Sequence, residues 1–314
     1  MAKDFNKDSL IYVTGHDGMV GSTLIPMLEK SGYKNLIFRT INELDLRNQA
    51  DVDSFFAANK PDVVIHIAAI VGGIIANIRS PAPFIYDNLM MQANVIHAAH
   101  NYKCKKLLFL GSSCIYPRES PQPMREEYLL SGKLEPTNQS YAIAKIAGIQ
   151  LCQSYNAQYN DNFISPMPCN IYGTRDHFDS ENSHVLAALV SRFHRAKVDA
   201  KPSVTVWGSG KPRREFIFED DIADAIIFLL EKYNNPEIIN VGPGYDIPVG
   251  DLAEKISEIV GYTGEIVFDK SKPDGMMRKL LDVSKITKLG WKAKTSLDDG
   301  IKKAYNYYRD HFKQ

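Results

Sequence analysis

Short apolar runs rich in β-branched residues alternate with longer amphipathic segments over the first half of the chain. The apolar runs predict five strands, at residues 9–14, 35–39, 62–68, 106–111 and 163–167. The segments between them predict helices at residues 21–31, 49–58, 84–101 and 141–159. Continuous apolar strands suit a parallel sheet that is covered on both faces. The alternation therefore predicts an α/β fold, a doubly wound parallel sheet with ligands at the carboxyl ends of its strands.

The pattern changes after about residue 170. Short helical segments are separated there by turn-rich stretches, which predicts a smaller C-terminal α/β lobe over the cleft. Residues 216–230 and 238–241 are apolar enough to return to the first domain. We therefore expect a discontinuous division, with one domain made of residues 1–170 and about 215–241, and the other of about 171–214 and 242–314.

Composition narrows the classes of function. The 314 residues are 44% hydrophobic and 24% charged, as in an ordinary globular protein. Lys plus Arg equals Asp plus Glu, at 37 each, so no net field favours nucleic acid or an anionic membrane. The longest apolar stretch, Val63–Ile78, is too short and too interrupted to span a bilayer, and we expect it to form a buried strand followed by a glycine-rich turn. We expect no nucleic-acid partner and no membrane partner.

The first residues and the cysteines bear on location. The start of the chain lacks the apolar core of a signal peptide. The four cysteines show no Cys-x-x-Cys or Cys/His spacing of a metal site. We expect a cytoplasmic protein without structural disulfides and without a metal.

A strand, a tight turn and a helix start meet in the glycine loop, Gly15-His-Asp-Gly18-Met-Val-Gly21. Glycines at this spacing permit the turn, a close approach of the backbone to a pyrophosphate, and close packing of the helix on the strand. The alternative is a purely structural turn. In its context of strand, turn and helix, the loop predicts a dinucleotide site.

Two residues bear on which dinucleotide is bound. An acidic residue at the end of the second strand would hold the ribose hydroxyls of NAD, whereas this strand ends in Arg39, which suits the 2′-phosphate of NADP. Asp17, within the glycine loop, adds a negative charge that opposes a phosphate. We favour NADP(H) as the cofactor, with NAD(H) as the alternative.

Tyr141 and Lys145 lie four residues apart, about one helical turn, and can face the same point of a cleft. A nearby ammonium favours the phenolate and lowers the pKa of a tyrosine, which is about 10 when unperturbed. Ser112, which follows a buried strand, can hydrogen-bond the same substrate oxygen. A chance pair on a helix surface is the alternative for Tyr141 and Lys145 alone. The order of glycine loop, Ser, Tyr and Lys predicts proton transfer at a carbonyl or alcohol beside a hydride transfer.

Cys114 and His184 are candidates for a second proton-transfer pair. Cys114 follows the strand that ends at Gly111, which places it at the rim of the cleft. A free thiol, with a pKa of about 8.5, is a credible base for a C–H bond made acidic by an adjacent ketone. We expect His184 in the first turn of another helix. The alternatives are a simply buried cysteine and a structural or solvated histidine.

Cations and an aromatic residue recur in the second half of the chain. Arg192 follows His184 by eight residues, about 12 Å along a helix, which is similar to the distance from a sugar ring to its attached phosphates. Trp207 offers a stacking surface, and the segments around Arg214 and Lys279 add cations. Taken singly, each segment is equally explained as a solvated loop. Together they indicate a nucleoside diphosphate ligand.

The chain resembles the extended short-chain dehydrogenase/reductase family, and within it the GDP-L-fucose synthases, over nearly its whole length. The most specific block is Leu110-Gly-Ser-Ser-Cys-Ile-Tyr-Pro117, and the glycine loop and Tyr141-Ala-Ile-Ala-Lys-Ile-Ala-Gly148 agree with it. Further matches are Glu135-Pro-Thr-Asn138, Trp207-Gly-Ser-Gly210 and residues 272–282. The resemblance implies a Rossmann fold and an NADP-dependent homodimeric enzyme that epimerises C3 and C5 of GDP-4-keto-6-deoxy-D-mannose and then reduces C4.

The resemblance also implies roles for the candidate residues. Cys114 and His184 would be the base and the acid of the epimerisation, and Tyr141, supported by Ser112 and Lys145, would protonate the C4 oxygen. The expected cofactor-binding residues are Gly15, His16, Asp17, Gly18, Met19, Val20, Gly21, Arg39, Leu110, Gly111, Lys145, Pro168, Asn170, Ile171 and His184. The expected sugar-nucleotide residues are Arg192, Trp207, Arg214, Asp274 and Lys279.

One departure from the family bears on the cofactor. Bacterial relatives commonly carry arginine where this chain has Asp17 and Ile41, and both arginines would serve the 2′-phosphate of NADP. The loss of both, with Arg39 kept, is why NAD(H) stays open as an alternative.

Other enzymes and one non-enzyme are the rival interpretations. A sister enzyme would act on another GDP-4-keto sugar, of the GDP-L-colitose or GDP-6-deoxyheptose type, because methyl-scale differences in a pocket are not visible in the sequence. A 4,6-dehydratase is disfavoured, since such enzymes carry an Asp-Glu pair where Ser113 and Cys114 stand. A simple 4-epimerase would not require Cys114 with His184. A non-catalytic NADP-binding sensor is the remotest alternative, because such proteins typically lose the Tyr or the Lys.

Overall fold

The first half of the chain is built on a parallel five-stranded sheet. The computed structural model describes residues 5–178, 183–272 and 274–312. The strand order is β2-β1-β3-β4-β5, and every pairing is parallel. The strands are β1 (Ile11–Thr14), β2 (Leu36–Ile37), β3 (Val63–His66), β4 (Lys106–Phe109) and β5 (Phe163–Ile164). All residues of β1, β3 and β4 are buried, as continuous apolar runs require.

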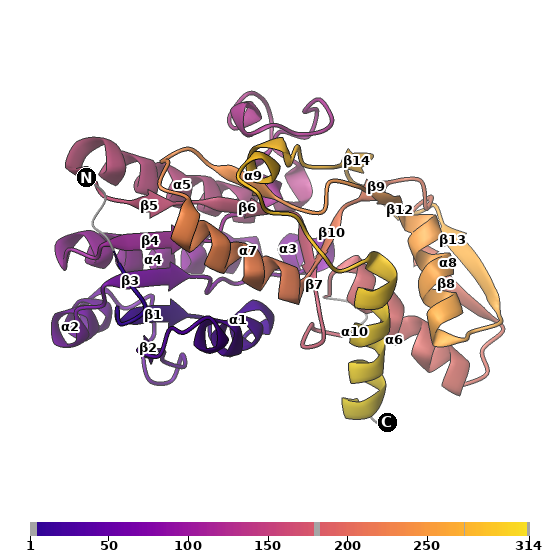
Figure 1. Cartoon of the computed structure of the whole chain (residues 1–314). Helices are drawn as coiled ribbons and strands as arrows, with labels where there is room; N and C mark the ends of the chain where they lie inside the picture. The colour runs from indigo at the N-terminus through magenta and orange to yellow at the C-terminus, as the bar shows by residue number, and fades with distance from the viewer. Residues whose placement is uncertain (1–4, 179–182, 273, 313–314) are drawn as a thin grey trace.

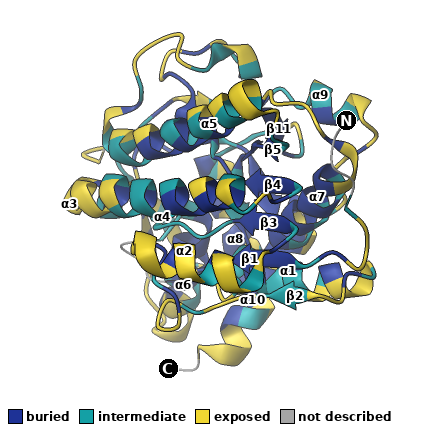
Figure 2. Cartoon of the chain, turned by 90° about the vertical axis from the view of Figure 1, so that its left-hand side faces the viewer, coloured by how far each residue is buried: buried dark blue, intermediate teal, exposed yellow. Residues whose placement is uncertain are grey.

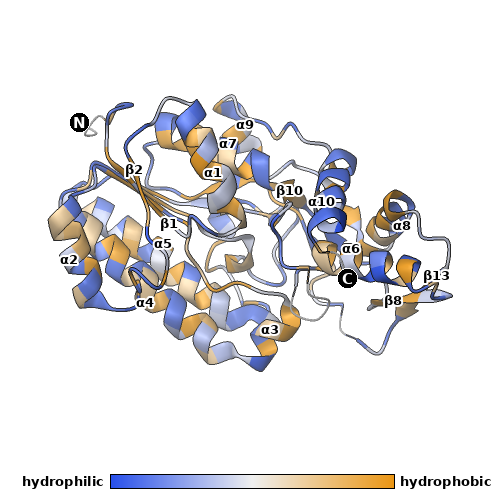
Figure 3. Ribbon diagram, turned by 90° about the horizontal axis from the view of Figure 1, so that it is seen from below, coloured by the Kyte–Doolittle hydropathy of each residue, from blue (hydrophilic) through white to orange (hydrophobic). Residues whose placement is uncertain are grey.

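Helices cover both faces of this sheet (Figure 3). One face carries α1 (Met19–Lys30) and α7 (Glu219–Lys232), which pack on each other. The other face carries α2 (Gln49–Asn59), α4 (Pro81–Asn101) and α5 (Gln139–Tyr159). These three helices turn exposed residues outward and buried residues toward the sheet (Figure 2). The predicted doubly wound α/β fold is therefore confirmed.

A buried lysine connects α7 to β4 of the sheet. Lys106, the first residue of β4, is 1% exposed. Its ammonium donates hydrogen bonds to Leu230 O at 2.7 Å, Tyr233 O at 2.5 Å and Asn234 Oδ1 at 2.9 Å, all at the carboxyl end of α7. Cations are favoured at that end of a helix, because the last carbonyl groups have no partner within the helix.

Two parts of the first half differ from the expectation. The stretch after β3, expected as a glycine-rich turn, contains the short helix α3 (Ile74–Arg79), where the Asn77 side chain donates to the carbonyl groups of Gly72 and Gly73. The strand expected at residues 163–167 is divided. β5 pairs with β4, whereas β6 (Pro166–Pro168) pairs with β11 (Ile239–Val241). Pro166 has no N–H group to continue the first ladder.

The second half forms a smaller lobe that lies to one side of the large sheet (Figure 1). Its helices are α6 (Val185–Val198), α8 (Val249–Val260) and α10 (Leu297–His311), whereas α9 (Ser284–Lys288) lies against β11 and packs in the core of the large sheet. Its strands pair as β7 (Asn170–Tyr172) with β10 (Phe216–Phe218), β8 (Ser203–Trp207) with β13 (Glu265–Asp269), and β9 (Arg213–Arg214) with both β12 (Ile247–Pro248) and β14 (Arg278–Lys279). Three short 3-10 helices precede it, η1 (Ser113–Ile115), η2 (Glu126–Tyr128) and η3 (Pro136–Asn138).

The buried apolar residues form two hydrophobic cores, one around the five-stranded sheet and one among α6, α8 and α10. β10 lies between them, since Ile217 belongs to the first core while Phe216 and Phe218 belong to the second. Ile286 and Trp291, late in the chain, pack in the first core. Two cores do not by themselves define folding units, so the domain boundaries stay a prediction. Over the described ranges, no helix is both long and apolar enough to cross a membrane.

Candidate active site

The glycine loop joins β1 to α1 at the carboxyl edge of the sheet. Gly15 has a φ of 69°, and a Cβ there would lie 2.9 Å from the backbone nitrogen of Ala68, just after β3. At Gly21 a Cβ would collide with the carbonyl oxygen of Gly15. Gly18 precedes α1, whose first turn has no side-chain cap. The backbone N–H groups of that turn are therefore available to an anion, which fits a dinucleotide pyrophosphate.

An unpaired buried nitrogen lies beside this loop. The ring of His16 stacks on Phe38 at 4.4 Å between centroids, and its buried Nδ1 has no partner among the described residues. Arg39 is exposed and donates from Nη1 to Phe38 O at 2.8 Å. Asp17 is also exposed, and Ile41 is 63% exposed. The site thus offers one unpaired imidazole nitrogen, one arginine and one carboxylate to the outer part of a dinucleotide.

The other expected cofactor residues follow or form neighbouring strands. Leu110 and Gly111 come directly after β4, and Gly111 N donates to Pro166 O at 2.9 Å. Pro168 ends β6, and Asn170 and Ile171 belong to β7. Met19 and Val20 open α1. Since carboxyl ends of parallel strands meet at one edge, these residues and the glycine loop share the edge where ligands of such sheets bind.

Ser112 connects the two expected proton-transfer groups. It is the N-cap of η1, where its Oγ accepts from Cys114 N at 3.2 Å. The same hydroxyl hydrogen-bonds the Tyr141 phenol, near the start of α5. Cys114 and Tyr141 are both half-buried. The structure therefore brings Ser112, Cys114 and Tyr141 into one group.

The electrostatics of Tyr141 differ from the expectation. Burial raises the pKa of its phenol, the charge of Cys114 raises it further, and the Ser112 hydrogen bond lowers it. The ammonium of Lys145 donates to Leu110 O at 2.8 Å and lies 5.9 Å from the centroid of the Tyr141 ring. Burial lowers the pKa of Lys145 to about 7. The expected lowering of the tyrosine pKa is therefore wrong for the chain alone, because desolvation outweighs a distant and partly neutral ammonium.

The thiol of Cys114 faces two nitrogen donors from distant parts of the chain. Asn138 Nδ2 lies 3.1 Å and Lys279 Nζ 3.3 Å from Cys114 Sγ. Lys279 also acts on His184, whose pKa is lowered by burial, then by Lys279 and by His177. His184 is the N-cap of α6 and does not lie in its first turn as expected, because its ψ of 153° is extended. The structure therefore places Lys279 near both Cys114 and His184.

The expected nucleotide residues continue from Lys279 into the second lobe. In β9 and β14, Arg214 and Lys279 are directly paired. Arg214 donates from Nη2 to Asp274 O at 3.3 Å, and the Asp274 carboxylate accepts from Ser209 N at 2.7 Å and Ser209 Oγ at 2.8 Å. Trp207, two residues before Ser209, is covered by the guanidinium of Arg192 at 4.6 Å. Neighbouring contacts therefore connect all five residues to Lys279, which reaches Cys114.

The sequence pattern of the NAD dependent epimerase/dehydratase family matches residues 11–242 of this chain. The chain belongs to this family. Its fold is that of other family members, since a GDP-mannoheptose C4 reductase from Campylobacter jejuni with NADP bound superposes with a TM-score of 0.90 at 41% identity, over 98% of this chain and 100% of that one.

Two named relatives are more similar in sequence. GDP-L-fucose synthase 1 of Arabidopsis thaliana is 52% identical over 303 residues, which cover 96% of this chain and 94% of the plant protein. GDP-L-fucose synthase of Escherichia coli is 49% identical over 310 residues, 96% of this chain and 97% of that protein. These similarities agree with the resemblance seen in the motifs.

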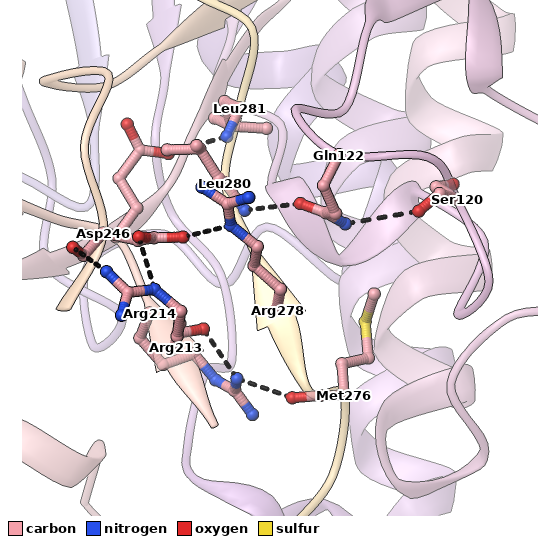
Figure 4. A network of polar contacts seen from close by, with 10 residues as sticks. Ser120, Gln122, Arg213, Arg214, Asp246, Met276, Arg278, Leu280 and Leu281 are labelled. Atoms are coloured by element: carbon pink, nitrogen blue, oxygen red, sulfur yellow. Dashed lines mark hydrogen bonds and ion pairs between the residues drawn. The ribbon is translucent and has the colours of Figure 1, made fainter. Parts of the chain in front are cut away.

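The carboxylates of two residues, Glu215 and Asp246, were missed in the sequence, and Figure 4 shows Asp246 bonded to Arg213 and Arg278. Glu215 is fully buried, and its oxygens accept from Gly244 N at 2.8 Å and Leu281 N at 2.9 Å. Asp246 accepts from Arg213 Nε at 2.8 Å and Arg278 Nε at 2.5 Å. Both hold the segment that carries Lys279. The available signal was Glu215 itself, a charge immediately before the apolar strand Phe216-Ile-Phe.

A third missed residue is Asn138, whose block was noticed but given no role. Its side chain reaches the thiol, as described above. No cluster of three or more His, Cys, Asp or Glu residues that could hold a metal ion occurs in the part of the chain that the structure describes.

Proposed function

We propose that this enzyme converts GDP-4-keto-6-deoxy-D-mannose into GDP-L-fucose, by inversion at C3 and C5 followed by NADPH-dependent reduction of the C4 ketone. The observation that carries the proposal is that Ser112 bonds both the backbone of Cys114 and the phenol of Tyr141. The Cys114 thiol, as a base, and the Tyr141 phenol, as an acid, can therefore act on the same bound sugar. The identities of 52% and 49% to the named synthases support the choice of sugar.

Cys114 and His184 perform the two inversions. C3 and C5 both flank the C4 ketone, so their C–H bonds are acidic. The Cys114 thiolate takes the proton, and the electron pair of the C–H bond moves to the C4 oxygen as an enolate, near Ser112 and Tyr141. His184 returns a proton to the same carbon from the opposite face. One C–H bond breaks and one forms, so no oxidant is needed.

Tyr141 and Lys145 serve the reduction. When bound, the nicotinamide supplies the hydride that C4 receives. The phenol of Tyr141 gives its proton to the C4 oxygen, which suits a group whose pKa burial has raised, because it is protonated at neutral pH. Lys145, on the same helix, holds the cofactor edge together through its bond to Leu110 O. Arg192, Trp207, Arg214 and Asp274 hold the nucleoside diphosphate.

The cofactor is NADPH in this proposal. Its support is the exposed Arg39 at the end of the second strand and the NADP in the similar heptose reductase. Asp17 is the residue that opposes it. We also propose a homodimer formed through the outer faces of α4 and α5 (Figure 2), where Tyr86 is 62% and Tyr159 is 50% exposed.

The test is cofactor oxidation with GDP-4-keto-6-deoxy-D-mannose, run in parallel with NADPH and NADH, with the product sugar identified by NMR. We expect GDP-L-fucose and faster turnover with NADPH. Cys114→Ser should still oxidise NADPH but yield a sugar with unchanged C3 and C5. Absence of turnover with this sugar, together with turnover of a GDP-4-keto-heptose, would replace the proposal by the activity of the heptose reductase at 41% identity.

A further inference from the structure

Asn138 lies beside the Cys114 thiol and has no role in the reaction described so far. It ends η3 and lies three residues before Tyr141, where the chain enters α5. Its Nδ2 lies 3.1 Å from Cys114 Sγ. Its Oδ1 is buried and has no hydrogen-bond partner among the described residues. The NH₂ group of this amide therefore has a hydrogen-bond partner, while its oxygen has none among the described residues.

The orientation of the amide follows from the chemistry of the thiolate. A thiolate has no proton to donate, so only the N–H end of an amide can hydrogen-bond it. That requirement turns Oδ1 of Asn138 away from the sulfur. A buried amide oxygen without a donor costs about 1–3 kcal/mol, and a hydroxyl group of a bound sugar is a donor that would satisfy it.

The second donor to the sulfur differs in kind. Lys279 brings a full charge from β14, and the same charge lowers the pKa of His184. The amide of Asn138 brings a donor without a net charge, so it stabilises the thiolate while leaving the neighbouring imidazole unaffected. Asn138 also lies three residues before Tyr141, so its hydrogen bond keeps the sulfur close to the Tyr141 phenol.

We propose that Asn138 is a catalytic residue of the epimerisation, whose Nδ2 holds the Cys114 thiolate and whose Oδ1 accepts a hydrogen bond from a hydroxyl group of the sugar. Only the role of Oδ1 in binding the sugar rests on the proposed function. The hydrogen bond from Nδ2 of Asn138 to the Cys114 thiolate joins two side chains of this protein, so it can be tested without any sugar.

The first experiment measures alkylation of Cys114 by iodoacetamide between pH 6 and 10, followed by mass spectrometry. The other three cysteines are buried, at 2%, 1% and 7% exposure for Cys104, Cys152 and Cys169, so the folded enzyme reports on Cys114. We expect Asn138→Asp to slow alkylation at pH 7 by about tenfold, because a donor to a charged group is replaced by a carboxylate. The pH midpoint of the rate should move upward.

Gln139→Ala is the matched control, since Gln139 is the exposed neighbouring amide. It should alkylate like the unchanged enzyme. Asn138→Ser is the second variant in case Asn138→Asp does not fold, and NADP⁺ binding verifies that each variant is folded. Alkylation rates and midpoints that are unchanged in both Asn138 variants would overturn the role in holding the thiolate.

The second experiment measures deuterium uptake from D₂O at C3 and C5 of GDP-4-keto-6-deoxy-D-mannose. We expect both Asn138 variants to lower the exchange rate by about tenfold and to raise KM, while Gln139→Ala changes neither. Slower alkylation with unchanged exchange would overturn the catalytic role. If the unchanged enzyme shows no exchange, the substrate proposal fails, and the alkylation result still decides whether Asn138 controls the thiol.

Discussion

The cofactor edge and the sugar corner of this enzyme are held by different means. The cofactor edge is held by close backbone packing, because Gly15 and Gly21 allow β1, α1 and the end of β3 to approach more closely than any side chain permits. At the sugar corner, the buried carboxylates of Glu215 and Asp246 hold the segment before and after Lys279. The cofactor edge depends on the lack of a side chain at its glycines, whereas the sugar corner depends on charged side chains. Substitutions should therefore damage the two regions in different ways.

The largest effect should come from Gly21→Ala, which breaks the backbone arrangement. The added Cβ would collide with backbone atoms of Gly15 and His16, which cannot move aside as a flexible side chain can. We expect a loss of about 3 kcal/mol in unfolding free energy, measured by urea denaturation. In Gly18→Ala the nearest atom to the new Cβ is 3.5 Å away, so that variant should keep its stability and lose only NADP⁺ affinity. Equal stability of the two variants would refute this account of the loop.

Lys145→Met sharpens the comparison by removing the charge buried at the cofactor edge. Burial lowers the pKa of Lys145 from 10.5 to about 7, so between these values the unfolded chain binds more protons and the stability due to this group rises with pH. At pH 6.5 the folded enzyme still carries the buried charge. The variant's stability relative to the unchanged enzyme should therefore be greater at pH 6.5 than at pH 9.5, by roughly 3 kcal/mol. Denaturation at both pH values measures the difference, and a pH-independent difference would contradict the shift.

Glu215→Gln tests the sugar corner. An amide has one acceptor oxygen, so one of the N–H groups of Gly244 and Leu281 would face an NH₂ group. We expect a loss of about 2 kcal/mol in stability and an approximately tenfold rise in KM for the sugar nucleotide, because the segment with Lys279 loosens. Asp221→Asn is the control, since its carboxylate bridges the N–H groups of Lys294 and Thr295 away from the site. That variant should lose stability with an unchanged KM. A similar KM for both variants would show that Glu215 does not position Lys279.

The smallest effect should come from Asp17→Arg, which changes charge at the cofactor edge without touching the backbone arrangement. An arginine there would attract the 2′-phosphate of NADP and would not attract the hydroxyl of NAD. We expect the ratio of NADP⁺ to NAD⁺ affinity to rise about tenfold, equal to about 1.4 kcal/mol, with unchanged stability. Asp51→Arg, an equal charge change at the exposed start of α2, is the control. Calorimetric titration measures both ratios, and equal gains for both cofactors would show a non-specific effect.

The fold was predictable wherever one local pattern determined one element. The apolar runs of β1, β3 and β4 and the helical segments of α2 and α5 could be found because each buries a continuous face. The short helix α3 was missed because six residues give no periodic signal. The division of residues 163–168 between β5 and β6 was missed because β6 is defined by its partner β11, more than seventy residues later. Domain boundaries stay a prediction.

The candidate site was predictable in its residue types and less so in its electrostatics. Ser112, Cys114 and Tyr141 were chosen from motifs, and the structure places them together. The expected effect of Lys145 on Tyr141 failed because a pKa depends on burial and on the true position of the ammonium, which a spacing of four residues does not give. Asn138 and Glu215 act through partners elsewhere in the chain, so their roles could not be predicted, although Glu215 stands out as a charge immediately before an apolar strand. The catalytic and binding roles remain proposals.

The Lys106 ammonium has a consequence for how the protein is made. β4 leaves the ribosome more than a hundred residues before the carbonyl groups at the end of α7, where Lys106 finds its acceptors. Until those residues emerge, β4 carries an ammonium that must stay in water, because burying an unpaired charge is too costly. The nascent sheet therefore cannot close over β4 early in synthesis. Lys106 can be buried with all of these acceptors only when the chain has grown past Asn234, the last of them.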